Sequence, residues 1–233
     1  MIERKLNRRL LSAASLVRQG AVFADIGTDH AYLPIFLLDE GRISRAVATD
    51  INEGPLASAE RNVSDAGYSA AVTFRLTDGA ASLAELGITD YAICGMGGEL
   101  IAEIISHAPH LFDEKLRLIL QPMTRQAYLR KYLLSHGFDI EREIYTEDGG
   151  KYYTCMLVSY SGVRRDISEE EATLGLGSTH HTGDGRVGYL RARLSSLRRA
   201  ADGKLRGGVA FPSELALISA IERLIPEILE NNT

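Results

Sequence analysis

The chain has 233 residues, of which 45% are hydrophobic, so we expect one globular domain with room for a small appendage. Its net charge of −5 argues, when taken as a whole, against a nucleic-acid partner. No apolar run approaches the roughly 20 residues that span a bilayer, and the charged first residues do not resemble a signal peptide, so we expect a cytoplasmic protein.

Apolar residues recur near helical spacing at the start of the chain, which predicts an amphipathic helix over 3–18. Short apolar runs then alternate with helical patterns. The predicted strands cover 21–26, 45–51, 71–78, 91–95 and 116–122, and the predicted helices cover 31–40, 53–67, 99–108 and 125–137. Because these strands are continuously apolar, the alternation indicates a parallel sheet with helices on both faces.

Two β-rich runs follow, over 138–147 and 151–160, and Asp-Gly-Gly joins them in a hairpin pattern. A parallel sheet that ends in an antiparallel hairpin is the layout of class I methyltransferases, whereas dinucleotide dehydrogenases usually continue with a further parallel strand. The predicted fold class is therefore α/β and Rossmann-like. Tyr152 and Tyr153 alternate sides of the second hairpin strand, so we expect one of them in the core.

The composition changes after Tyr160, which suggests three parts: a nucleotide-binding domain over 1–160, a linker over 161–185, and a helical C-terminal domain over 186–233. Helices are predicted over 186–202 and about 213–230, as a coiled-coil-like hairpin. The first carries most of a basic cluster, which either contacts phosphates or forms a solvated helix face. His180 and His181 have no further ligands at metal-binding spacing, so we predict no metal.

Acidic residues and glycines fall at four consecutive strand ends. Asp25 closes the first predicted strand, Asp50 the second and Asp78 the third, and three glycines follow the fourth. In open α/β sheets the ligand lies beyond the carboxyl ends of the strands. A carboxylate in the position of Asp50 can accept hydrogen bonds from both hydroxyl groups of a ribose. The pattern therefore predicts an adenosine-type cofactor, although a single acidic residue at a strand end is usually a turn residue.

The loop after the first strand reads "ADIGTDHAYLP" and departs from the glycine-rich dinucleotide pattern. A pyrophosphate needs small residues and free backbone amides at a helix N-terminus, and here Asp25 and Asp29 would repel it. S-adenosylmethionine instead brings a sulfonium and an amino group, which suit nearby carboxylates. The loop thus favours a methyl donor.

Five motifs in this order, "ADIGTDHAYLPIFLL", "EGPLASAERNV", "AICGMGGELI", "LRLILQPM" and "EDGGKYY", resemble the bacterial tRNA (adenine-22)-N1-methyltransferase family over roughly residues 3–160. The resemblance implies an enzyme that methylates N1 of an adenosine in the D-arm region of tRNA, with S-adenosylmethionine as cofactor. It also implies that Gly95 to Gly98 flank the reaction centre. The implied cofactor-binding residues are Asp25, Gly27, Asp29, His30, Asp50, Ile51, Asp78, Gly79, Gly95, Met96 and Gly97.

The expected partner is tRNA, with no membrane and no metal, and a monomer is favoured. The predicted catalytic residues are Asp29, His30 and Gln121, and the predicted substrate-binding residues are Tyr32, Pro122, Arg191, Arg198 and Arg199. Asp29 is equally suited to cap a helix, and His30 to fix the loop. Tyr32 is expected to pack more than to stack. The alternatives are a methyltransferase for another RNA or a small molecule, and a non-catalytic module that binds S-adenosylmethionine or RNA.

Overall fold

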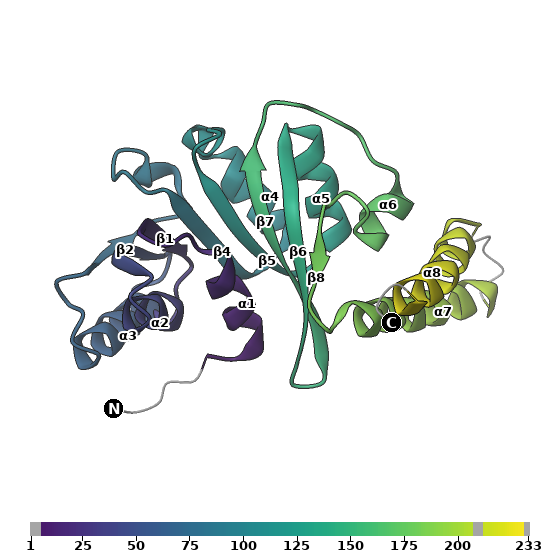
Figure 1. Cartoon of the computed structure of the whole chain (residues 1–233), viewed down its shortest axis with the longest axis horizontal. Coiled ribbons are helices and arrows are strands. Elements are labelled where there is room, and N and C mark those ends of the chain that lie inside the picture. Colours follow the sequence, from purple (N-terminus) through teal and green to yellow (C-terminus); the bar gives the residue numbers. More distant parts are fainter. Residues whose placement is uncertain (1–5, 207–211, 231–233) are drawn as a thin grey trace.

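The computed structural model describes residues 6–206 and 212–230, which form one eight-stranded sheet with helices on both faces (Figure 1). The strand order is β3-β2-β1-β4-β5-β7-β6-β8. The first five strands are parallel, whereas β7 is antiparallel to both β5 and β6. The strands are β1 (Ala21–Ile26), β2 (Ile43–Asp50), β3 (Val72–Leu76), β4 (Asp90–Gly97), β5 (Arg117–Thr124), β6 (Phe138–Asp148), β7 (Lys151–Tyr160) and β8 (His181–Thr182). The predicted fold class is confirmed.

The helices of the sheet domain pack in two layers, and the last two form a separate pair. On one face lie α1, α2 and α3, and on the other lie α4, α5 and two short 3-10 turns. The helices are α1 (Arg8–Leu16), α2 (Tyr32–Asp39), α3 (Glu53–Asp65), α4 (Gly98–Ser106), α5 (Gln126–Ser135), α6 (Glu169–Leu174), α7 (Arg186–Arg206) and α8 (Pro212–Glu230), and the turns are η1 (Ala81–Leu83) and η2 (Pro109–Leu111).

The two cores follow from the alternation of side chains along the strands. In β4, Tyr91 and Ile93 pack in the cluster with α4 and α5, whereas Ala92 packs in the cluster with α1 and α2. A third, smaller cluster joins α7 to α8 and includes Leu174 of α6. The helical pair therefore has its own core and lies at the opposite end of the sheet from α2 and α3 (Figure 1).

The predicted element bounds differ from the observed ones mainly at their ends. Helix α1 begins at Arg8, after Asn7 caps it by accepting a hydrogen bond from the backbone N–H of Leu10 at 2.9 Å. The first part of the predicted helix over 3–18 lies outside the described residues, as does part of the predicted connection between the last two helices. Helix α8 continues through Pro226.

The segment predicted to be a linker contains two ordered elements, α6 and β8. A capping box begins α6: the Ser168 hydroxyl accepts a hydrogen bond from the backbone N–H of Glu171, whose carboxylate accepts one from the backbone N–H of Ser168. Strand β8 pairs in parallel with β6. Arg130 of α5, which is fully buried, donates a hydrogen bond to the carbonyl oxygen of Ala172 at 2.7 Å and thereby ties α6 to the sheet domain.

Helix α7 packs closely on the β6–β7 hairpin. A Cβ atom added at Gly188 would lie 2.1 Å from the ring of Tyr152, so that glycine allows the helix to approach the strand. Neither Tyr152 nor Tyr153 is buried, so the expectation that one of them lies in the core is wrong. Over the described ranges, no helix combines the length and apolar character that crossing a membrane requires.

Candidate functional site

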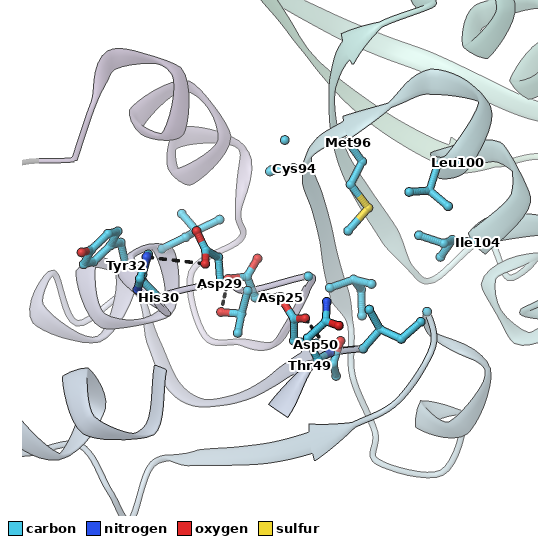
Figure 2. A pocket seen from close by; sticks show the side chains of 18 of the residues that line it. Asp25, Asp29, His30, Tyr32, Thr49, Asp50, Cys94, Met96, Leu100 and Ile104 are labelled. Atoms are coloured by element: carbon cyan, nitrogen blue, oxygen red, sulfur yellow. Dashed lines mark hydrogen bonds and ion pairs between the residues drawn. The ribbon is translucent and has the colours of Figure 1, made fainter. Parts of the chain in front are cut away.

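A pocket of about 650 Å³ opens at the carboxyl ends of β1, β2 and β4 (Figure 2). Its volume falls within the usual range for a small-ligand site. Every residue predicted to bind the cofactor except Gly97 lines it: Asp25, Gly27, Asp29, His30, Asp50, Ile51, Asp78, Gly79, Gly95 and Met96. Parallel strands end at the same edge of a sheet, which is why residues from distant parts of the sequence gather here.

The loop between β1 and α2 has an unusual backbone. Gly27, Asp29 and Ala31 all have positive φ angles, of 71°, 55° and 55°. Positive φ is uncommon for residues other than glycine and often occurs at functional sites. The N-cap of α2 is Ala31, which provides no side-chain hydrogen bond, so the alternative that Asp29 caps this helix is wrong.

Asp25 is the buried carboxylate of the pocket. Its Oδ2 atom accepts a hydrogen bond from the Thr28 hydroxyl at 2.7 Å, which favours the ionised form. Burial outweighs that bond and, with a smaller contribution from the Asp50 charge, raises the pKa of Asp25 from 3.8 to about 6. The carboxylate is therefore ionised at neutral pH, but its burial makes the charged form less favourable. A nearby cation would stabilise the charged form.

The other carboxylates differ in their surroundings. Asp50 lies at the end of β2, where its Oδ1 atom accepts a hydrogen bond from the backbone N–H of Asn52 at 2.9 Å, and within the described residues no hydrogen bond to its Oδ2 atom occurs. Asp29 and Asp78 are exposed at the pocket. Four carboxylates in one pocket favour a cationic ligand and disfavour a phosphate.

An apolar wall made by Met96, Leu100 and Ile104 faces these carboxylates (Figure 2). Gly27 brings the loop against this wall, because a Cβ atom added there would lie 2.2 Å from the Met96 Cε atom. Cys94 also lines the pocket, but burial raises the pKa of its thiol well above 9. The thiol is therefore protonated at neutral pH and unsuited to act as a nucleophile.

His30 and Tyr32 form an aromatic pair at the side of the pocket (Figure 2). Their ring centroids are 5.3 Å apart and their planes differ by 29°, a stacked arrangement. Tyr32 is 45% exposed, so part of its ring is open to a ligand while part packs against the protein. The His30 Nε2 atom lies 3.5 Å from Oδ1 of Asp29, which places an exposed carboxylate beside the ring pair.

Several predicted site residues lie outside the pocket lining. Gln121 and Pro122 are buried in β5, because that strand continues to Thr124 rather than ending at residue 122. The side-chain carbonyl of Gln121 accepts hydrogen bonds from Arg9 and from the backbone N–H of Gly95. Gln121 therefore holds two residues that line the pocket without lining it itself. Gly97 pairs with Thr124 in the sheet.

The last glycine of the "GMGG" motif has a packing role. A Cβ atom at Gly98 would lie 2.5 Å from the carbonyl oxygen of Arg125, so this position allows α4 to begin against the loop before α5. Gly98 does not line the pocket.

The predicted substrate arginines lie on α7, away from the pocket. Arg191, Arg198 and Arg199 are exposed, and Arg191 and Arg198 lie nearly above one another because seven residues are close to two full turns; Arg199 is turned by about 100° from Arg198. Arg198 forms an ion pair with Glu222 of α8 at 2.5 Å, whereas Arg199 donates a hydrogen bond to the Ser195 hydroxyl. The His181 ring hydrogen-bonds to the carbonyl of Gly175, and among the described residues no group of three potential metal ligands occurs.

Helix α1 contributes pocket residues that the sequence did not predict, namely Asn7, Arg9 and Leu10. The helix packs on β4 to β7 and reaches the pocket from the hairpin side. Its amphipathic pattern predicted a packed helix. The pattern gave no signal for the part of the sheet that it would contact.

The chain is similar to known methyltransferases in sequence and structure. A family model described as "Methyltransferase domain" matches residues 6–156. A tRNA (adenine(22)-N(1))-methyltransferase of Bacillus subtilis is 36% identical over 177 residues, which cover 76% of this chain and 74% of the relative. A Streptococcus pneumoniae protein crystallised with S-adenosyl-L-methionine has a TM-score of 0.79 at 31% identity, covering 95% of this chain and 100% of that one. M. capricolum TrmK bound to S-adenosyl-homocysteine has a TM-score of 0.69 at 26% identity, with 97% of each chain covered.

Proposed function

This chain belongs to the tRNA (adenine(22)-N1)-methyltransferase family, and on this premise we propose that it transfers a methyl group from S-adenosylmethionine to N1 of adenosine 22 in tRNA. The pocket at the ends of β1, β2 and β4 carries the proposal, because its carboxylates and its apolar wall suit a cationic nucleoside. A tRNA substrate also implies a cytoplasmic protein.

The residues of the pocket fit this cofactor group by group. Asp50 would bind the ribose hydroxyls, and Asp78 with Gly79 would contact the adenine beside the apolar wall. Asp25 and Asp29 would lie at the methionine end, where their charge favours a sulfonium and an ammonium group. When bound, the cofactor supplies an electrophilic methyl group on sulfur.

The chemistry on the protein side is mainly positioning. The N1 lone pair of adenine is free at neutral pH, so the transfer needs alignment of the base more than a strong general base. N1 lies on the Watson–Crick edge, so the target base must leave its stack. We assign the exposed His30–Tyr32 pair as the platform on which that base stacks, and Asp29 as the carboxylate that stabilises the cationic product.

We further propose that α7 holds the body of the tRNA. Arg191 and Arg199 are exposed and form no ion pair within the described part of the chain, so their charge is available to phosphates. Arg198 lies on the same side of α7 as Arg191 and is paired with Glu222. Phosphate contacts of this kind position the RNA and carry no sequence information.

Methyl transfer to tRNA tests the function directly. Purified protein is incubated with methyl-labelled cofactor and either a tRNA with adenosine at position 22 or the same tRNA with guanosine there. We expect about one methyl group per molecule of the first tRNA and none in the second, with primer extension stopping at position 22. Equal labelling of both tRNAs would contradict the assignment, and labelling of free adenosine would favour a small-molecule substrate.

The matched control for this experiment is the double variant Arg191→Gln/Arg199→Gln. It should bind S-adenosylhomocysteine as the unmodified protein does. It should bind tRNA more weakly, with a salt dependence reduced by about two in the slope of log K against log salt concentration. Cofactor binding without transfer to any RNA would favour a binding module over an enzyme.

Cofactor affinity is expected to fall as the pH drops below 6. Asp25 attracts the cationic end of the cofactor only when it is ionised, and its raised pKa of about 6 means that protonation competes with binding below this value. Each pH unit below the pKa should cost up to about tenfold in affinity. Calorimetric titrations with S-adenosylmethionine from pH 5 to pH 8 measure this.

The variant Asp25→Asn is the control for this pH dependence. It should bind weakly and with the same affinity across that range, and a persistent decrease below pH 6 would assign the effect to another group. For the unliganded protein, the effect of pH on the free energy of unfolding has the opposite sign to its effect on cofactor affinity. Because the folded pKa of Asp25 exceeds the unfolded value of 3.8, the folded state binds more protons, and this group's contribution to stability is lost as the pH rises through 6.

A further inference from the structure

Arg9 is the permanently charged cation among the described residues that line the pocket. The residue is half-buried, and its Nη1 atom donates a hydrogen bond to Gln121 Oε1 at 2.5 Å. The guanidinium carbon lies 6.0 Å from the ring centroid of Tyr153, within the range of a cation–π contact. Two side chains of the sheet therefore hold Arg9 in place.

No carboxylate in the described ranges forms an ion pair with Arg9, unlike several other arginines. Its neighbour Arg8 pairs with Asp184 at 2.8 Å. The interaction of Arg9 with Asp148 involves the backbone N–H rather than the guanidinium. A guanidinium has five N–H donors. A half-buried arginine whose guanidinium has no anionic partner is therefore suited to bind an anion.

The position of Arg9 relative to the carboxylates matters for which anion fits. Its Nη1 atom lies 3.7 Å from where a Cβ atom of Gly95 would be, so the charge is at the end of β4. Arg9 and the buried carboxylate Asp25 line the same pocket, so it offers one positive and one negative group to a ligand. An α-amino acid carries an ammonium and a carboxylate on the same carbon, and it matches such a pair.

We propose that Arg9 binds the α-carboxylate of the cofactor's methionine moiety and forms, with the pocket's carboxylates, a site for a zwitterion. This rests on the proposed function. An RNA phosphate is the other anion that Arg9 could meet, but four carboxylates line the same pocket and would repel it. The carboxylate of the cofactor brings its own ammonium group, which offsets that repulsion.

The test compares two ligands that differ in a single group, S-adenosylhomocysteine and its decarboxylated analogue, which keeps the ammonium group. Calorimetry should show that the unmodified protein binds the first at least tenfold more tightly. The variant Arg9→Gln should bind the two with equal affinity, because charge-assisted hydrogen bonds to the carboxylate are lost. Arg9→Lys should restore part of the preference, since it keeps the charge but not the fork of donors.

The control is Arg8→Gln on the same helix, which should keep the full preference. If the unmodified protein binds neither ligand, the proposed function fails. If it binds both equally, or if Arg9→Gln weakens both by the same factor, the carboxylate assignment is overturned. Weaker tRNA binding with an unchanged ligand preference would assign Arg9 to a phosphate instead. The ratio of the two dissociation constants, measured on the same variant, is unaffected by a partial loss of folded protein.

Discussion

Replacing Asp50 by asparagine is expected to weaken the binding of S-adenosylhomocysteine by about 100-fold. The substitution keeps a side-chain oxygen that can accept the hydrogen bond from the backbone N–H of Asn52, so the turn after β2 is retained. It removes the charge and turns an amide N–H₂ toward one of the two ribose hydroxyls. Hydrogen bonds to a charged group contribute about 1.5–3 kcal/mol, and a factor of 100 corresponds to about 2.7 kcal/mol.

Isothermal calorimetry at pH 7.5 measures this change, at a pH where Asp25 is ionised. S-adenosylhomocysteine is the appropriate ligand because it lacks the sulfonium charge, so loss of simple charge attraction contributes less. The control is Asp65→Asn at the exposed end of α3, which should bind as the unmodified protein does. A loss of less than threefold in Asp50→Asn would place the ribose elsewhere.

The variant Arg130→Met should lose about 3–5 kcal/mol of unfolding free energy, the range found when one partner of a buried ion pair is removed. Arg130 and Glu143 are both fully buried, and their side chains form two hydrogen bonds, of 2.6 and 3.0 Å. The Tyr145 hydroxyl donates to the same carboxylate. Without the guanidinium, a buried negative charge remains and the tie to α6 is lost.

Urea unfolding followed by circular dichroism measures this loss. The adjacent variant Lys131→Met removes an exposed ion pair with Glu169 and should cost less than about 1 kcal/mol. The double variant Arg130→Met/Glu143→Gln should recover part of the loss, because it removes the stranded charge and keeps an acceptor for Tyr145. A loss below 1 kcal/mol in Arg130→Met would mean that the pair contributes little to the fold.

The residues at strand ends could be predicted because they depend on one general property of parallel sheets. Asp25, Asp50 and Asp78 follow apolar runs, and the carboxyl ends of such strands meet at one edge whatever the details of packing. The antiparallel hairpin was also predictable, since its Asp-Gly-Gly turn is a local signal. These parts of the fold need little information beyond residues adjacent in the chain.

The remaining features depend on contacts between distant residues. Arg9 lies 112 positions from Gln121, and no local pattern around either residue indicates that they meet. Strand β8 has two residues and is fixed by its pairing with β6 rather than by its own propensity. Gln121 was predicted to be catalytic, but β5 continues to Thr124 and buries it, and its side chain contacts Arg9 from a distant part of the chain.

The strand order also sets a minimum length for the RNA. Three interstrand spacings separate β4, which carries Gly95, from β6, on which α7 packs; at ~4.8 Å each they amount to ~14 Å. Helix α7 then extends ~30 Å along its own axis. A ligand that fills the pocket and also touches the arginines of α7 must bridge this width, which a single nucleoside cannot do. We therefore expect a tRNA fragment that is too short to span this width to enter the pocket without reaching the arginines of α7.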